Sequence, residues 1–505
     1  MRRSGILLPL FSLPSPYGCG CFSDDAKAFL DFLHRAGQSF WQILPLGPAG
    51  KGYSPYLPLS VFAGDPLFID PDKLEAMGYL TETETQAAKE EERGPDPRRI
   101  DYKRVRWSRQ RLLSIAYRRF MSSAPASTQT AFRAFCKESA PWLEDVALFM
   151  ETGARFRTPS WRMWPRAIRK RDPACLARLR EEWQDDLLRW KWMQFEFFRQ
   201  WRDIKEYANR KGIEIIGDVP IYVSPEGADV WARPDLFRLD KTLRPCPVAG
   251  CPPDLFSREG QVWGNPLYRW QDRREDVFSW WARRLQGRFR LYDIIRLDHF
   301  RGFESFYAIP GPGRDAREGH WEKGPGLSFF QYLEKQIPKA RFIAEDLGFL
   351  TPAFRAFQEA TAYPGMEVLQ FAFDGNPANP YLPEHHRENA VVYTGTHDTD
   401  TALGWASHLP PQKREEIRQR MKKRQMPTAE EIAAYLLAEA EGSRAKICIL
   451  PMQDVLGEGS ASRTNVPGVR SGNWVYRLPD HAFAEAVAER MARLTARADR
   501  GMPVT

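Results

Sequence analysis

The chain has 505 residues, of which 43% are hydrophobic, 27% charged and 13% aromatic, and its formal net charge is +8. This composition is typical of a globular protein and excludes a disordered or fibrous chain. The length allows one large domain or about three ordinary ones, with a core large enough to need no disulfide.

A short apolar run follows Arg2 and Arg3 in the sequence. A secretion signal starts in this way, but Pro9, Pro14 and Pro16 interrupt the run, so we predict no signal. No stretch approaches the roughly 20 apolar residues of a membrane span. We therefore expect a cytoplasmic protein with no membrane partner.

The seven cysteines are spread from Cys19 to Cys448 without a C-x-x-C pair. Cys19 and Cys21 are close in sequence but have no histidine nearby. Neither a zinc site nor a disulfide framework is therefore expected. We predict a protein that uses no metal ion and no cofactor.

Short apolar, β-rich runs alternate with longer stretches of helical pattern, and this alternation predicts a parallel α/β fold. Helical patterns include Asp25 to Ala36, Phe278 to Leu285 and Ala429 to Ala440. The predicted strands are, in chain order, Phe40 to Leu44, Ile213 to Gly217, Leu291 to Leu297, Phe342 to Ala344, Glu367 to Phe373, Ala390 to Tyr393 and Ile447 to Leu450.

Most of these strands end in polar side chains. A (β/α)8 TIM barrel, whose site lies at the carboxyl ends of its strands, fits this pattern better than a doubly wound sheet. No G-x-G-x-x-G motif follows a strand, which removes the main indication of a dinucleotide-binding fold. We predict a single catalytic barrel over residues 1–505.

Two segments are too long for ordinary barrel connections. Residues 71–211 are charged, aromatic and mostly helical in pattern, and we interpret them as a helical insertion. The basic stretch from Arg155 to Arg180 in this segment is compatible with nucleic-acid binding. Mixed charge signs and the lack of a nucleic-acid motif favour a solvated helical face instead, with no nucleic-acid partner. Residues 231–268, rich in Pro, Gly and aromatic side chains, form a second predicted insertion.

The strand predicted at Leu291 to Leu297 leads into Asp298. Because side chains alternate along a strand, Ile294, Arg296 and Asp298 share one face. The guanidinium of Arg296 favours the ionised form of Asp298 and lowers its pKa. An ionised carboxylate is what a glycosidic nucleophile requires. The alternative interpretation is a purely structural ion pair.

Glu345 ends the next strand, in the segment Arg341-Phe-Ile-Ala-Glu-Asp-Leu-Gly348. An apolar wall or a neighbouring carboxylate would raise the pKa of Glu345, as a general acid requires. The alternative is a residue at the start of a helix, where Asp and Glu are favoured. Asp346 could fill that structural role instead.

The strand at Ala390 to Tyr393 ends in Thr-Gly-Thr followed by His397 and Asp398. Both side chains can bind sugar hydroxyls. His and Asp also bind metals, but a full ligand set is not assembled around them. Together the three strand ends supply a nucleophile, an acid/base and a third carboxylate, as retaining glycoside chemistry requires.

These segments resemble the amylomaltases and plant-type disproportionating enzymes, the 4-alpha-glucanotransferases of glycoside hydrolase family 77 in the α-amylase clan. The similarity runs nearly from end to end. Its motifs are Arg3-Ser-Gly-Ile-Leu-Leu-Pro-Leu10, Trp41-Gln-Ile-Leu-Pro-Leu-Gly-Pro48, Ser54-Pro-Tyr56, Gly217-Asp-Val-Pro-Ile-Tyr222, Gly264-Asn-Pro-Leu-Tyr268, Pro364-Gly-Met366, Asn379-Pro-Tyr-Leu-Pro383, Pro451-Met-Gln-Asp454 and Ser471-Gly-Asn-Trp474.

The resemblance implies a barrel with helical insertions, no separate C-terminal β-domain, and residues 231–268 over the acceptor sites. The implied activity is transfer of α-1,4-glucan segments between maltooligosaccharides by double displacement, in a monomer or homodimer. Asp298 would be the nucleophile, Glu345 the acid/base and Asp398 the transition-state stabiliser. The implied substrate-binding residues are Tyr56, Asp218, Asp254, Phe256, Trp263, Arg296, His299, His397 and Asn465.

The chain departs from the family pattern at a few positions. Cys19 and Cys21 replace a usual Ile and Asp, Glu367 stands where a basic residue is common, and Val466 lacks a hydroxyl near the expected sugar site. These positions are not the three carboxylates, so catalysis is expected to be retained while chain-length preference could shift. An α-glucan hydrolase and a catalytically silent glycan-binding protein stay open as alternatives.

Overall fold

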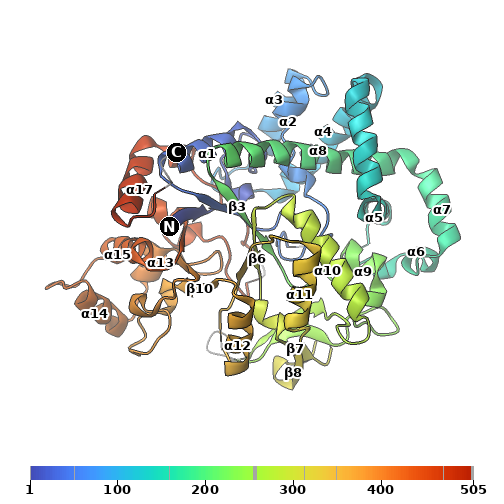
Figure 1. Ribbon diagram of the computed structural model, residues 1–505. Coiled ribbons are helices and arrows are strands. Elements are labelled where there is room, and N and C mark those ends of the chain that lie inside the picture. The colour runs from blue at the N-terminus through green and yellow to red at the C-terminus, as the bar shows by residue number, and fades with distance from the viewer. Residues whose placement is uncertain are drawn as a thin grey trace.

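A computed structural model describes residues 2–50, 52–158, 160–253, 259–311, 313–348, 350–469 and 471–501. Its centre is an eight-stranded parallel sheet in the order β10-β11-β12-β1-β2-β3-β6-β9, surrounded by helices (Figure 1). The strands are β1 (Arg3–Leu7), β2 (Phe40–Gln42), β3 (Glu214–Val219), β6 (Ile294–Leu297), β9 (Phe342–Ala344), β10 (Gly365–Val368), β11 (Ala390–Tyr393) and β12 (Ile447–Pro451).

The two outer strands of this sheet, β9 and β10, meet and close it. The Ala344 N–H donates a hydrogen bond to the Pro364 carbonyl oxygen over 2.8 Å, directly before β10 begins. Strand residues such as Ile6, Ile216 and Ile295 are fully buried, as expected where helices cover the outside of a parallel barrel. The predicted (β/α)8 barrel is confirmed.

Helices alternate with the barrel strands. The first of them is capped as the helix dipole favours: the Ser23 hydroxyl accepts the Asp25 N–H, and acidic residues occupy the first turn. The helices outside the long insertion are α1 (Asp24–Arg35), α9 (Ala228–Ala232), α10 (Arg274–Phe289), α11 (Leu327–Gln336), α12 (Pro352–Thr361), α13 (Ala402–Ser407), α14 (Pro411–Arg420), α15 (Ala429–Gly442), α16 (Met452–Leu456) and α17 (Glu485–Arg497).

The segment between β2 and β3 is mostly helical. In Figure 1 its long helices α4, α5 and α8 lie at the top and right of the barrel, and α5 packs along α8. The Thr81 hydroxyl and the Glu84 carboxylate form a capping box that starts one of the helices. The helices are α2 (Pro71–Ala76), α3 (Glu82–Glu92), α4 (Tyr102–Ser123), α5 (Ala126–Phe156), α6 (Arg166–Arg169), α7 (Pro173–Glu182) and α8 (Gln184–Arg210).

A second, antiparallel sheet was not predicted. Its order is β5-β4-β7-β8. Two strands, β4 (Val248–Cys251) and β5 (Gln261–Pro266), come from the second predicted insertion, residues 231–268. The other two, β7 (Ser305–Ile309) and β8 (His320–Lys323), follow β6. After β12 the described residues form only helices and irregular segments, and α17 packs against α1.

Several predicted elements need correction. The strand β1 was missed, because its apolar run was interpreted as a failed signal sequence. The strand predicted at Glu367 to Phe373 begins at Gly365 and ends at Val368, where a 3-10 turn follows. The strand predicted from Leu291 begins only at Ile294. Apolar runs continue into turns here, so hydrophobicity alone does not mark the strand ends.

Gly217 in β3 lies directly against the ring of Tyr292. A Cβ at Gly217 would stand 2.1 Å from the Tyr292 ring, which no side chain tolerates. Glycine therefore lets the buried Tyr292 pack under the strand, at the residue that precedes Asp218. The position of Asp218 at the barrel end depends on this close approach.

Candidate active site

Two carboxylates leave neighbouring barrel strands at the same level. In the register of β6 with β9, Leu297 pairs with Ala344, so Asp298 and Glu345 are the next residues of each strand. The Glu345 N–H donates to the Leu297 carbonyl oxygen over 3.1 Å, and the Asp298 N–H donates to that of Val219 over 3.1 Å. Backbone hydrogen bonds therefore fix both residues at the carboxyl end of the barrel.

Arg296 joins two further strand positions. Asp218 in β3 is the register partner of Arg296 in β6. The Arg296 Nη1 donates to Asp218 Oδ2 over 2.6 Å and to Asp298 Oδ1 over 3.1 Å, and both Arg296 and Asp218 are buried. The Tyr56 hydroxyl donates to the same Asp218 oxygen over 2.7 Å. The ion pair predicted from alternation in the sequence is present, and Asp218 extends it.

The direction of the pKa shift at Asp298 differs from our expectation, whereas Glu345 has the raised pKa that we predicted. Burial raises the pKa of Asp298 well above its ordinary value, Arg296 lowers it, and the charges of Asp218, Glu345 and Asp398 raise it again. The prediction that Arg296 would leave the pKa of Asp298 below its ordinary value is wrong, because burial outweighs the ion pair.

The pKa of Glu345 is raised as well, mainly by burial and against the effect of Arg296. Arg296 hydrogen-bonds directly to Asp298, and this contact favours the ionised form of that carboxyl. Asp298 and Glu345 thus lie at neighbouring strand ends, and burial raises the pKa of both carboxyls.

His299 contacts Glu345 through its backbone. Its φ of 49° is in the left-handed region, and its N–H donates to Glu345 Oε2 over 2.5 Å. Burial lowers the pKa of the His299 imidazole to about 4. The ring is therefore neutral near pH 7, and its Nε2 has no hydrogen-bond partner among the described residues.

Asp398 follows β11 and is held by two neighbours. The Asn465 Nδ2 donates to Asp398 Oδ1 over 2.6 Å, and the His397 Nε2 lies 3.4 Å from Asp398 Oδ2. Burial lowers the pKa of His397, although Asp398 opposes this. The side chain of Asp398 is 46% exposed, so its oxygens are open to a ligand.

Aromatic rings stand on two sides of these carboxylates. The rings of Tyr56 and His397 are stacked with centroids 5.1 Å apart, and the ring of Trp474 lies 5.8 Å from that of Tyr56. On the other side, the ring of Trp263 meets that of His299 edge to face at 4.9 Å. Flat apolar rings beside polar oxygens are suited to binding pyranose rings.

The structure brings most of the predicted site residues into this cluster. Asp254 and Phe256 lie outside the described residues. Two aromatic residues were missed as site residues, although both lie within the quoted motifs. The Tyr222 ring lies 6.1 Å from that of Trp263, and Trp474 contacts Tyr56 and His397. Tyr222 lies shortly after β3, and Trp474 lies in the loop beside Asn465. These positions in the sequence could have identified both as site residues.

Metal-binding clusters and membrane-spanning helices are both absent from the described part of the chain. The described residues contain no group of three or more His, Cys, Asp or Glu side chains arranged to hold a metal ion. No helix in the described ranges has both the length and the apolar character needed to cross a membrane.

Comparison with known proteins finds relatives along the whole chain. The family model described as 4-alpha-glucanotransferase matches residues 8–482. A 4-alpha-glucanotransferase of Thermus thermophilus is 41% identical over 504 residues, covering 98% of this chain and 99% of that protein. Another, of Clostridium butyricum, is 40% identical over 496 residues, covering 96% of this chain and 98% of that protein.

A solved structure also matches closely. It is an amylomaltase from Streptococcus agalactiae in complex with acarbose, with 34% sequence identity and a TM-score of 0.94. The match covers 99% of this chain and 100% of that one. Sequence and fold therefore point to the same group of proteins.

Proposed function

This chain belongs to the 4-alpha-glucanotransferase family, glycoside hydrolase family 77, and we propose that Asp298, Glu345 and Asp398 carry its transfer reaction. Its substrates in this proposal are maltooligosaccharides and α-1,4-glucans. The observation that carries the assignment is the arrangement at β6 and β9. Asp298, paired with Arg296, stands at the end of β6, and Glu345 stands at the same level on the neighbouring strand β9. In this proposal Asp298 reacts in its ionised form and Glu345 in its protonated form.

In the first step Asp298 attacks the anomeric carbon of the donor glucan. A bond forms between an Asp298 oxygen and that carbon while the glycosidic bond to O4 breaks. Glu345 gives its proton to the leaving O4, so the shortened glucan departs as a neutral alcohol. The product of this step is a covalent glycosyl ester on Asp298, with inverted configuration.

In the second step the proton returns to Glu345. Its carboxylate accepts the proton of the 4-hydroxyl of an acceptor glucan, whose oxygen attacks the same carbon. The ester bond to Asp298 breaks and an α-1,4 linkage forms again. Two inversions give net retention, and the product is a longer glucan beside glucose or a short maltooligosaccharide.

The surrounding residues have binding roles in this proposal. Asp398, held by Asn465 and His397, accepts hydrogen bonds from the 2- and 3-hydroxyls of the distorted sugar and so stabilises the transition state. Tyr56 and Trp263 pack against sugar faces. The remaining proposed substrate-binding residues are Asp218, Asp254, Phe256, Arg296 and His299, of which Asp254 and Phe256 rest on the family resemblance alone.

We also propose a role for the two insertions in a single catalytic unit of residues 1–505. Residues 71–211 form a helical insertion beside the barrel. Residues 231–268 lie over the acceptor sites and exclude water there, so that a sugar rather than water attacks the ester. Trp263, in contact with His299, supports this placement.

The reaction type is tested with pure maltotriose as the only substrate. Transfer yields glucose and a ladder of longer oligomers with a constant total of reducing ends. Hydrolysis yields a steady rise in reducing ends and would reject this function. A cytoplasmic location and a monomer or homodimer are further proposals, tested by cell fractionation and by light scattering on the purified protein.

A further inference from the structure

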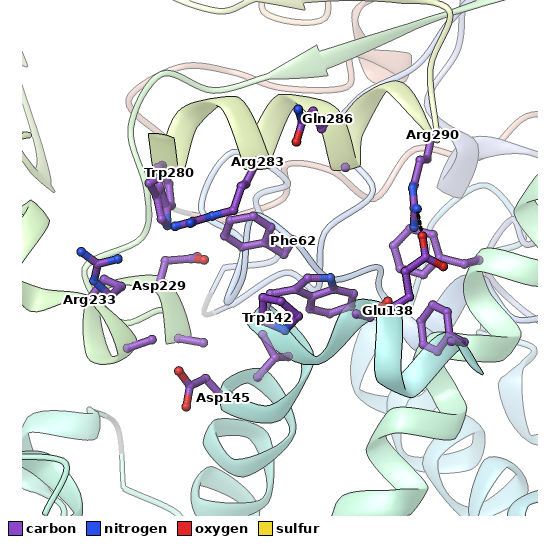
Figure 2. Close-up of a pocket in the computed structure, with 18 residues that line it drawn as sticks. Phe62, Glu138, Trp142, Asp145, Asp229, Arg233, Trp280, Arg283, Gln286 and Arg290 are labelled. Atoms are coloured by element: carbon purple, nitrogen blue, oxygen red, sulfur yellow. Dashed lines mark hydrogen bonds and ion pairs between the residues drawn. The ribbon is translucent and has the colours of Figure 1, made fainter. Parts of the chain in front are cut away.

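A second hollow lies between the helical insertion and the outside of the barrel. It has a volume of about 310 Å³ and is lined by α5, α8, α9, α10 and the loop that carries Phe62 (Figure 2). None of the described residues assigned to the active site lines it. Its volume is at the lower end of the range of about 300–1,000 Å³ for small-molecule sites.

Aromatic side chains form the apolar part of this hollow. The rings of Phe62 and Trp142 are nearly parallel, at 14°, with centroids 6.5 Å apart. The Trp280 ring meets Phe62 edge to face at 5.7 Å. Phe62 and Trp142 are only partly buried, and Figure 2 shows both in the middle of the hollow. They offer flat apolar faces to a ligand.

The polar part of the lining is balanced in charge. Three acidic and three basic side chains contribute, namely Glu138, Asp145, Asp229, Arg233, Arg283 and Arg290.

Most of these charges are paired with each other or with neighbours. Glu138 pairs with Arg290 at one end of the hollow, as the dashed line in Figure 2 shows, and Arg233 pairs with Asp235 over 2.7 Å. Arg283 has neither a hydrogen bond nor an ion pair among the described residues, and Figure 2 shows it directed toward Phe62 and Trp280. Its donors are free to bind a ligand.

We propose that this hollow is a second, non-catalytic binding site for an α-1,4-glucan, which holds one or two glucose units of a long chain. The inference rests on the proposed function, since glucans are the ligands that the enzyme meets. Apolar ring faces surrounded by planar hydrogen-bonding groups match a pyranose, which has apolar C–H faces and a hydroxyl rim. The neutral balance of the lining disfavours an ionic ligand.

The loop of residues 54–63 joins this hollow to the active site. Tyr56 at its start bonds Asp218 over 2.7 Å, and Phe62 near its end lines the hollow. The Val61 N–H donates to Asp229 Oδ2 over 2.9 Å, and the Ala228 N–H donates to the Leu59 carbonyl oxygen over 2.7 Å. The hollow is thus held at a fixed position relative to the catalytic carboxylates.

A long glucan that binds at both places is retained at a high effective concentration near the cleft. Occupancy of the hollow should therefore lower KM for amylose. The KM for maltotriose should not change, because so short a substrate cannot occupy both sites. The kcat values should not change.

The experiment compares Trp142→Ala and Arg283→Ala with a matched control, Trp107→Ala. Trp107 is 64% exposed on α4, outside the residues that line the hollow. We expect each test variant to raise KM for amylose about fivefold or more, with kcat and the KM for maltotriose unchanged. Arg283 is exposed, so its variant keeps the test valid if Trp142→Ala fails to fold.

Binding is measured separately in an Asp298→Asn background, by calorimetry with maltoheptaose. We expect a second, weaker class of sites that Trp142→Ala removes. Equal KM values for amylose in test and control variants, or displacement of maltoheptaose from the weaker sites by inorganic phosphate, would overturn the inference. The maltotriose ladder tests the proposed function independently, since it needs no second site.

Discussion

The backbone N–H of His299 donates to Glu345 Oε2 over 2.5 Å from a residue in the left-handed conformation. That conformation costs a non-glycine residue about 1–2 kcal/mol. The structure therefore maintains a strained residue between Asp298, the proposed nucleophile, and Glu345, the proposed acid/base. The strain aims one donor at Glu345, and this donor opposes the rise of the pKa of Glu345.

Two substitutions of His299 distinguish the effect of its backbone conformation from the effect of its imidazole ring. His299→Asn and His299→Val both remove the imidazole, but Asn tolerates the left-handed region and Val does not. We expect the kcat of His299→Val to be about ten- to a hundredfold lower than that of His299→Asn. This factor corresponds to the loss of one hydrogen bond to a charged group. Steady-state rates on maltotriose measure the difference.

The pH profile gives a second readout of this bond. Loss of the N–H donor raises the pKa of Glu345, so the acid form persists to higher pH. The alkaline limb of kcat should move upward in His299→Val and stay in place in His299→Asn. Equal profiles for the two variants would argue against a backbone role for His299.

Arg296→Met should affect both activity and stability. The buried Asp218 loses its ion-pair partner and keeps only the Tyr56 hydroxyl as a side-chain donor, which costs about 3–5 kcal/mol of unfolding free energy. Because Arg296 lowers the pKa of Asp298, its removal raises that pKa, and the acidic limb of the rate profile moves to higher pH. Denaturant melts and pH–rate profiles measure the two effects.

The double variant Arg296→Met/Asp218→Asn is the control for Arg296→Met. It removes the unpaired buried charge, so most of the stability should return while the activity does not. Recovery of activity together with stability would mean that Arg296 acts only on the fold.

Asn465→Ala removes the donor that orients Asp398. A hydrogen bond to a charged group is worth about 1.5–3 kcal/mol, so we expect kcat/KM to fall about ten- to a hundredfold. Asn473→Ala is a suitable control, because Asn473 holds the same loop through the Val466 and Val469 carbonyls without touching Asp398. A similar loss in both variants would assign the effect to loop order.

Asp454 contributes a pH dependence of stability. Burial raises its pKa to about 6, above the value of about 4 in an unfolded chain. Its stabilising contribution is therefore complete below about pH 4 and is lost as the pH rises through about 6, by up to about 3 kcal/mol.

Asp454→Asn should flatten this part of the stability profile. Unfolding free energies at about pH 4 and about pH 7, measured for the wild type and the variant, test the sign. The exposed Asp480→Asn serves as the reference. A wild-type slope that persists in Asp454→Asn would show that other groups cause it.

Local pattern predicted much of the barrel and of its site. Alternation along one strand placed Arg296 and Asp298 on a common face, and their ion pair is present. The order of strands and helices predicted the fold, because each barrel unit is local in sequence. Glu345 and Asp398 needed the family resemblance, since a single acidic residue after a strand has several structural explanations.

Relationships between distant segments were not predictable in this way. The antiparallel sheet pairs β4 with β7, across the whole of β6 and α10, and no local pattern records such pairing. The predicted direction of the Asp298 pKa shift was wrong for the same reason. The sequence shows its neighbour Arg296, but not the burial and the carboxylates from other strands that outweigh it.

The most direct test of the account is to trap the ester on Asp298. A slow 5-fluoroglycosyl fluoride donor is incubated with the enzyme, and the labelled peptide is identified by mass spectrometry. We expect a glycosyl ester on Asp298 and none in Asp298→Asn. A label on another carboxylate, or an Asp298→Asn variant that disproportionates maltotriose at the wild-type rate, would contradict it.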